Sequence, residues 1–379
     1  MENLPHAVWQ LPEHVRVAQW DILESSHCVH RSMCMAEAPE NVLMIENIPS
    51  SRLSLENIER SSLLIDPVFL NTPQFQSDSL SRRLEMEVVL KVETVNPIRS
   101  FKGRGADFLV ACLPAEPQTL VCASAGNFGQ GLAYAAGKRS FRVVVFAAQS
   151  ANPLKVERMR ELGAEVRLFG SDFDQAKEEA RRFAEHTRAR FIEDGREPQI
   201  AEGAGTIAVE LCRSVKRLET LLIPLGDGAL VAGIGRWMKT HSPSTRIVGV
   251  CAAGAPAMAT SWREGKLRST ETTSTIADGI ATRVPVPESL LNLAGLMDEV
   301  LLVEDKSLVE AMRLVFSHHG LVIEPAGAAG LAAAITYKER FRGSRVATPL
   351  CGGNLTSEQI RRWLTVVVGD PLESATAQP

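Results

Sequence analysis

The sequence predicts an α/β fold of two domains, each built on an open, mostly parallel twisted sheet flanked by helices. Three observations support this prediction. From about residue 61, short apolar segments alternate with segments of helical length, as in parallel βαβ units. The chain of 379 residues exceeds the size at which a single core usually stops growing. Several predicted strands also end in loops of small residues that open a helix, where ligands bind in such sheets.

The first half of the chain contains the clearest alternation. Residues 86–92 are apolar and β-branched, which is typical of a strand, and residues 128–138 form a helical segment rich in small side chains. We expect further strands at residues 119–123, 141–147 and 164–169, and further helices at residues 101–113, 152–162 and 173–187.

The second half repeats this alternation around a long connection. Residues 265–289 are rich in Thr, Ser and Pro and predict a loop. We expect strands at residues 221–225, 246–251, 300–303 and 345–350, and helices at residues 203–215, 230–240, 306–318, 327–337 and 356–364.

The predicted domains follow from these patterns. Residues 1–60 lack clean alternation and are interpreted as an N-terminal extension, with a short helix at 51–60, that packs on the body or on a partner subunit. Residues 61–93 and 195–370 form the larger, discontinuous domain, residues 94–194 the small domain, and residues 371–379 a frayed tail. The extension carries His27, Cys28, His30 and Cys34, whose spacing matches no zinc pattern, so no metal site is predicted.

Composition excludes several classes of protein. The net charge of -4 gives no basic surface for nucleic acid, and no apolar run is long enough to span a bilayer. The first ten residues lack the basic and apolar regions of a secretory signal. Seven scattered cysteines fit reduced thiols better than a disulfide framework, so we expect a cytoplasmic protein.

Lys102 lies in an unusual sequence context for a lysine. Lys102 follows Phe101 and precedes Gly103, before an apolar helical segment. A lysine held against apolar surface loses hydration, which disfavours its ammonium form and yields an amine nucleophile for a Schiff base. The alternative is a lysine at a helix N-terminus whose stem packs while its head reaches water.

Two loops at strand ends offer binding groups. The loop from Gly226 to Ala229 opens a helix at Leu230, where backbone N–H groups suit a phosphate, although the Asp227 carboxylate would repel one unless it points away. The alternative is a plain tight turn. The loop Ser124-Ala125-Gly126-Asn127 could hold a carboxylate, or its side chains could simply cap the next helix.

Two further positions carry polar side chains near predicted strand ends. Cys351 is either a weak partner for a ring nitrogen or a buried structural thiol. Glu324 either faces the cleft as an acid or complements a helix dipole. His318 and His319 are interpreted as cations at a helix C-terminus.

An ordered set of motifs resembles one family over roughly residues 62–367. The motifs are Thr72-Pro73, Lys91-Val92-Glu93, Ser100-Phe101-Lys102-Gly103-Arg104-Gly105-Ala106, Ala123-Ser124-Ala125-Gly126-Asn127, Gly163-Ala164-Glu165-Val166, Glu202-Gly203-Ala204-Gly205-Thr206-Ile207, Ile276-Ala277-Asp278-Gly279-Ile280-Ala281, Glu324-Pro325-Ala326-Gly327-Ala328 and Cys351-Gly352-Gly353-Asn354. In this order they resemble the type II fold of pyridoxal-phosphate enzymes, and most of all the threonine/serine dehydratases (ammonia-lyases).

The resemblance implies a cofactor, an activity and a set of roles. The larger domain would bind pyridoxal 5'-phosphate through a Schiff base on Lys102, which would also be the base at the α-carbon of a small amino-acid substrate. The expected product is a 2-oxo acid with ammonia, and the expected assembly is a homodimer. The remaining roles are Phe101 on the pyridine ring, Asn127 on the phenolate oxygen, Gly226, Asp227, Gly228, Ala229 and Leu230 on the phosphate, Cys351 at the ring nitrogen, Glu324 at the ring edge, and Ser124, Ala125, Gly126 and Asn127 on the substrate carboxylate.

Several departures leave the activity open. Asp227 and Ala229 interrupt the usual glycine run, and Phe128 stands where relatives often carry His. Ala125 replaces the serine base of racemising relatives, so racemase activity is not expected. No C-terminal regulatory domain is expected, and so no feedback by isoleucine. The alternatives to elimination are a β- or γ-replacement enzyme or synthase on the same fold, and a non-enzymatic relative that binds the cofactor.

Overall fold

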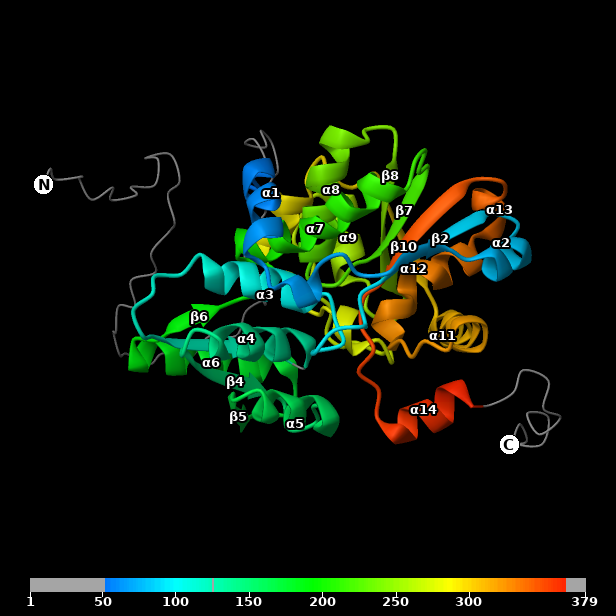
Figure 1. Cartoon of the computed structure of the whole chain (residues 1–379). Helices are drawn as coiled ribbons and strands as arrows, with labels where there is room; N and C mark the ends of the chain where they lie inside the picture. Colours follow the sequence, from blue (N-terminus) through cyan, green and yellow to red (C-terminus); the bar gives the residue numbers. More distant parts are fainter. Residues whose placement is uncertain (1–51, 125, 366–379) are drawn as a thin grey trace, which may run out of the picture. The chain divides into compact units, whose positions relative to one another are not determined.

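The computed structural model describes residues 52–124 and 126–365. Two sheets organise these residues (Figure 1). The larger sheet has six strands in the order β1-β2-β10-β7-β8-β9, and the smaller has four in the order β5-β4-β3-β6. Only β1 runs antiparallel to its neighbour among the described strands, so both sheets are mostly parallel and the predicted fold class is confirmed.

The strands of the larger sheet come from both ends of the described chain. They are β1 (Gln74–Gln76), β2 (Glu87–Val92), β7 (Thr220–Pro224), β8 (Arg246–Ala252), β9 (Glu299–Val303) and β10 (Arg345–Leu350). The strands of the smaller sheet lie within one continuous stretch. They are β3 (Thr119–Ala123), β4 (Arg142–Ala147), β5 (Glu165–Leu168) and β6 (Arg190–Ile192).

Helices connect and cover these strands. They are α1 (Leu55–Leu64), α2 (Asp78–Leu84), α3 (Lys102–Ala111), α4 (Asn127–Gly137), α5 (Pro153–Glu161), α6 (Phe173–Thr187), α7 (Pro198–Ser214), α8 (Ala229–His241), α9 (Ala257–Glu264), α10 (Pro287–Leu293), α11 (Asp305–His319), α12 (Pro325–Thr336), α13 (Lys338–Phe341) and α14 (Ser357–Leu364), with short 3-10 turns at Pro67–Phe69 and Asp278–Ile280. Helix α3 lies between α4 and α7 (Figure 1).

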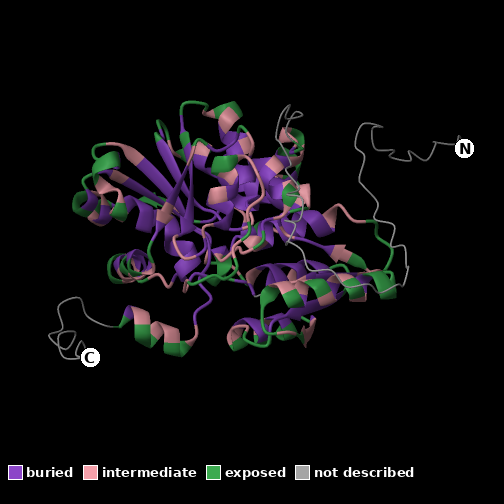
Figure 2. Ribbon diagram, turned by 180° about the vertical axis from the view of Figure 1, so that it is seen from behind, coloured by how far each residue is buried: buried purple, intermediate pink, exposed green. Residues whose placement is uncertain are grey.

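Burial explains why the main elements form. The strands are mostly buried except the short β1, β5 and β6, whereas the outer helices alternate buried and exposed residues (Figure 2). Helix α12 is apolar on all sides and buried from Pro325 to Ala334, because it packs against β7, β8 and β10. Such a helix needs an interior position, which the larger sheet provides. Gly330 permits this packing, since a Cβ there would overlap Leu222 and Thr348.

Most predicted elements occur within a few residues of their expected bounds, and the exceptions have local causes. Strands β1 and β6 have three residues each, too few to show a period of two. Helix α7 begins at Pro198 rather than at residue 203, and α10 begins at Pro287 inside the predicted loop 265–289, because proline is favoured at a first helical turn.

The helix predicted at residues 51–60 occurs instead as α1, Leu55–Leu64. It packs on α7, and Ile58 is fully buried. The backbone N–H of Ser54 also donates to Glu202 Oε1 at 2.8 Å. The His27, Cys28, His30 and Cys34 cluster and the 371–379 tail lie outside the described residues. The domain boundaries stay a prediction.

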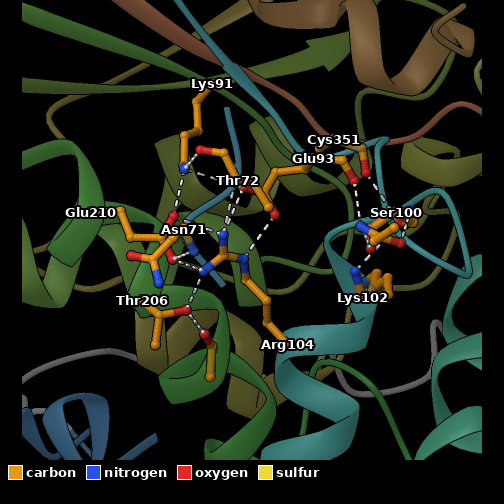
Figure 3. A network of polar contacts seen from close by, with 12 residues as sticks. Asn71, Thr72, Lys91, Glu93, Ser100, Lys102, Arg104, Thr206, Glu210 and Cys351 are labelled. Atoms are coloured by element: carbon orange, nitrogen blue, oxygen red, sulfur yellow. Dashed lines mark hydrogen bonds and ion pairs between the residues drawn. The ribbon is translucent and has the colours of Figure 1, made fainter. Parts of the chain in front are cut away.

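A buried ion network fixes the start of α3 (Figure 3). The Arg104 guanidinium is fully buried and bonds Glu93 at 2.8 Å and Glu210 at 2.7 Å. The ammonium of Lys91, also fully buried, lies 2.5 Å from Glu210 and donates to the Thr72 carbonyl at 2.7 Å. Two cations therefore balance two carboxylates and join β2, α3 and α7.

Replacing Arg104 by Met should destabilise the protein strongly. Two buried carboxylates would lose their main partner, and breaking a buried pair on one side costs about 3–5 kcal/mol. Urea unfolding of the protein without added cofactor measures this free energy. Arg142→Ala, which breaks the exposed pair with Glu165, is the matched control and should cost under about 1 kcal/mol. Equal costs for the two variants would contradict the assigned importance of the network.

Candidate active site

A cavity of about 490 Å³ opens where parallel strands of both sheets end. Ala123 and Ser124 line it at the end of β3, Gly226 and Asp227 after β7, and Cys351 after β10. The carboxyl ends of parallel strands are where open α/β sheets bind ligands. The cavity therefore lies where the sequence placed a cleft.

Lys102 points into this cavity from the first residue of α3. Its side chain is 11% exposed, and its Nζ lies 2.5 Å from Asp194 Oδ2 and 2.8 Å from Asp227 Oδ2. The Phe101 ring lies beside it, with 4.9 Å between Nζ and the ring centroid. The backbone N–H of Phe101 donates to the Cys351 carbonyl at 3.1 Å, which ties the start of α3 to the end of β10.

These contacts correct the expected chemistry of the lysine. Burial opposes the charged form of Lys102, but the carboxylates of Asp194 and Asp227 outweigh it and raise its pKa above the usual range. From the sequence we expected apolar surroundings to disfavour the ammonium form of Lys102 and so to leave a neutral, reactive amine. The structure instead holds Lys102 as an ammonium between two carboxylates, so the amine is released only when that proton moves.

The loop after β7 forms a backbone cradle at the start of α8. Gly228 has φ +97°, a conformation that L side chains rarely adopt, and a Cβ on Gly226 would press on the Gly279 carbonyl. Within the described residues, the N–H groups of Gly226, Asp227 and Gly228 donate no backbone hydrogen bond. Unpaired N–H groups at a helix N-terminus suit a phosphate.

The side chain of Asp227 is turned toward the lysine. Its Oδ2 lies 2.8 Å from Lys102 Nζ, and its Oδ1 accepts the Ala229 N–H at 2.9 Å. Ala229 is the one predicted phosphate-loop residue that does not line the cavity. The Asp227 carboxylate thus occupies the Ala229 N–H, which is no longer free to bind a phosphate.

Asn127 belongs to a second polar network that lines the cavity. Its Nδ2 donates to Glu324 Oε1 at 2.6 Å, and its Oδ1 accepts from Asn354 at 2.9 Å. Lys155 Nζ lies 3.4 Å from Glu324 and 2.7 Å from Asp278. Burial disfavours the Lys155 ammonium, but these two carboxylates prevail and raise its pKa to about 12. The Asn127 amide is therefore held in one orientation.

Two positions left open by the sequence are now described. Ser124 Oγ accepts the N–H groups of Gly126 at 3.1 Å and Gly129 at 2.9 Å, as expected of a capping residue, and its O–H remains a donor. Cys351 is buried at the cavity wall, and burial raises the pKa of its thiol, which is therefore neutral. Ala125 lies outside the described residues.

The predicted residues meet in one place. Phe101, Lys102, Ser124, Gly126, Asn127, Gly226, Asp227, Gly228, Leu230, Glu324 and Cys351 all line the cavity. His318 and His319 end α11 as predicted, and His319 Nε2 lies 2.8 Å from Ser77 Oγ, away from the cavity lining. Burial and the neighbouring His318 lower the pKa of His319, so the interpretation of His319 as a cation is wrong.

Sequence reasoning missed several charged residues of the cavity, and two of them, Asp194 and Lys155, form ion pairs with predicted site residues. Asp194 follows β6, whose three residues gave no strand pattern. Had that strand been predicted, the Asp-Gly pair after it would have indicated a strand-end site. Lys155 lies one turn into α5, and its burial depends on Gly126, where a Cβ would overlap its side chain.

The fold and cavity define an enzyme that holds a phosphorylated carbonyl cofactor on a lysine. Residues 65–352 match the family described as pyridoxal-phosphate dependent enzyme. The chain is 32% identical over 312 residues to an L-threonine ammonia-lyase of Thermotoga maritima, covering 82% of this chain and 78% of that protein. It is 32% identical to the chloroplastic biosynthetic threonine dehydratase of Arabidopsis thaliana, covering 86% of this chain and 56% of that protein.

A solved structure of maize serine racemase is similar in fold, with a TM-score of 0.77 and 26% identity over 82% of this chain and 96% of that one. The chain belongs to the pyridoxal-phosphate dependent enzymes, and its cofactor is pyridoxal 5'-phosphate. The residues present fit that group. Lys102 offers an amine, the loop after β7 offers unpaired N–H groups, and Asn127 and Cys351 offer further polar atoms at the cavity wall.

Gly228→Ala should weaken cofactor binding. A side chain at φ +97° costs about 1–2 kcal/mol, which here distorts the phosphate cradle and predicts roughly tenfold lower affinity. Equilibrium dialysis against pyridoxal 5'-phosphate measures the change. Gly265→Ala, also at positive φ but open on all sides and outside the cavity lining, is the matched control and should keep the affinity. The same loss in both variants would count against the cradle.

Proposed function

We propose that this protein eliminates the β-hydroxyl and the amino group of an amino acid such as threonine or serine, releasing a 2-oxo acid and ammonia. The observation that carries the proposal is the meeting of Lys102, the loop after β7, Asn127 and Cys351 in one cavity. Similarity to an L-threonine ammonia-lyase of Thermotoga maritima supports the same reaction.

Each of these groups has a task in the proposed reaction. Pyridoxal phosphate, when bound, supplies an electron sink for charge that develops at the substrate α-carbon. Lys102 holds the cofactor and then removes the α-proton as a neutral amine. The N–H groups of Gly226, Asp227 and Gly228 bind the phosphate.

Asn127 would bond the phenolate oxygen of the cofactor in the orientation set by Glu324. The Ser124 hydroxyl and the start of α4 at Asn127 receive the substrate carboxylate, because the first N–H groups of a helix attract an anion. The neutral Cys351 thiol would be the partner of the ring nitrogen and, as a weak hydrogen-bond donor, would leave it unprotonated, which suits elimination.

A replacement reaction is the main rival. Elimination and β-replacement share the loss of the β-substituent and differ in whether water or a second nucleophile follows, whereas γ-replacement exchanges a group at the γ-carbon. Incubating the purified protein with threonine and serine, with and without added thiol, separates the two. Release of 2-oxo acid without thiol supports elimination, whereas a thioether product without 2-oxo acid would support replacement and contradict the proposal.

Lys102→Ala should lose both cofactor and activity. The variant lacks the amine that holds the cofactor, so its visible absorbance band should disappear. Loss of the base alone should lower 2-oxo acid release by about 10²–10⁴-fold. Lys177→Ala removes a lysine of the same cavity that pairs with Glu193 at 3.2 Å, and this control should keep the band. A wild-type protein without the band, or a Lys102→Ala protein with it, would refute the assignment.

A further inference from the structure

Two carboxyl groups face the reactive lysine, and one of them is not used by any role given above. Asp194 Oδ2 and Asp227 Oδ2 both contact Lys102 Nζ, at 2.5 and 2.8 Å. Asp227 is further engaged by the Ala229 N–H. Asp194 contacts Lys102 and Asp227, but its Oδ1 is buried without a hydrogen bond among the described residues. This oxygen belongs to a residue that lines the cavity.

The charges around Asp194 favour a protonated carboxyl. Two neighbouring carboxylates that share one cation do not both ionise readily. Burial and the charge of Asp227 raise the pKa of Asp194 to about 8, although Lys102 works in the opposite sense. For Asp227, burial is outweighed by Lys102 and by the hydrogen bond from Asp194, so its pKa is lowered.

The other groups near Asp194 do not supply a competing charge. Glu193, the preceding residue, is paired with Lys177 at 3.2 Å and Arg181 at 2.8 Å on α6. Cys122 on β3 is buried, and its pKa is raised by that burial and by Asp194, so its thiol is neutral. Lys102 and Asp227 therefore determine the protonation of Asp194.

We propose that Asp194 is a catalytic acid that gives a proton from Oδ1 to the β-oxygen of the substrate as the Cβ–O bond breaks, and recovers a proton at Oδ2 from Lys102. This inference rests on the proposed elimination. Asp194 would be the proton donor of the reaction, and Lys102 remains its base.

The protons and electrons balance over one turnover. The Lys102 amine takes the α-proton, and the electron pair of the Cα–H bond becomes the Cα=Cβ bond. The Cβ–O pair leaves with oxygen, which takes the Asp194 proton and departs as water. The Lys102 ammonium then returns its proton to the Asp194 carboxylate across the 2.5 Å contact, which restores both groups.

The leaving group provides the test, because chloride needs no proton to depart whereas hydroxide does. Asp194→Asn should lower 2-oxo acid release from serine by about 10²–10⁴-fold, the usual contribution of a general acid. Release from β-chloroalanine should stay within about threefold of wild type, because the acid matters only for a leaving group that must be protonated. Asp172→Asn, at the exposed rim of the same cavity, keeps its cap on α6 and is the matched control.

Infrared spectroscopy supplies a readout that does not depend on turnover. The wild-type protein at pH 7 should show the carbonyl stretch of a protonated carboxylic acid, which Asp194→Asn lacks and Asp172→Asn keeps. The stretch should fade with a midpoint near pH 8, as the raised pKa requires. Asp227→Asn removes the neighbouring charge, so it should move that midpoint to lower pH. These spectra and the wild-type pH profiles remain decisive if Asp194→Asn does not fold.

The sign of the pH dependence follows from the acid form. Asp194 is protonated below its pKa, which burial and Asp227 raise, so turnover of serine by the wild-type protein should fall as pH rises through that pKa, and turnover of β-chloroalanine should not share that fall. Equal losses on both substrates in Asp194→Asn, or no loss on serine, would overturn the assignment. If wild type releases no 2-oxo acid from serine or threonine, the proposed elimination itself fails, which is a different result.

Discussion

The contact between the Lys102 ammonium and the carboxylates of Asp194 and Asp227 sets the chemistry of the cavity. It brings together the start of α3, the end of β6 and the loop after β7, which lie far apart in the sequence. A buried ammonium is stable only beside such partners. Cofactor binding must therefore redistribute one positive charge and at least one proton, and the pair of aspartates provides the place for that proton.

Below this contact, the network of Arg104, Lys91, Glu93 and Glu210 keeps α3 from shifting. Its two cations and two carboxylates are buried and mutually satisfied, so the network adds no net charge under the cavity. The lysine is consequently presented from a rigid helix start rather than from a loop. Precise placement of a reactive group matters because small displacements lower rates strongly.

The sequence predicted the fold class and most of the cavity, since alternating patterns and strand-end loops are local signals. Lys102, Asn127, the Gly226–Leu230 loop and Cys351 were all found in this way, with their roles inferred from resemblance. Asp194 escaped notice because β6 is too short to show a pattern. The direction of the Asp227 side chain could not be predicted, because its partner Lys102 is distant in the sequence. The charge state of Lys102 was misjudged for the same reason.

The central claim is that Lys102, and no other lysine, carries the cofactor. Lys155 and Lys177 also line the cavity, but their ion pairs are with Asp278, Glu324 and Glu193, whereas Lys102 pairs with Asp227 of the loop after β7. Borohydride reduction of the cofactor-loaded protein fixes the link covalently, and mass spectrometry of the peptides locates it. The account predicts the pyridoxyl mass on the peptide that contains Lys102. The same mass on the Lys155 peptide, or on none, would contradict it.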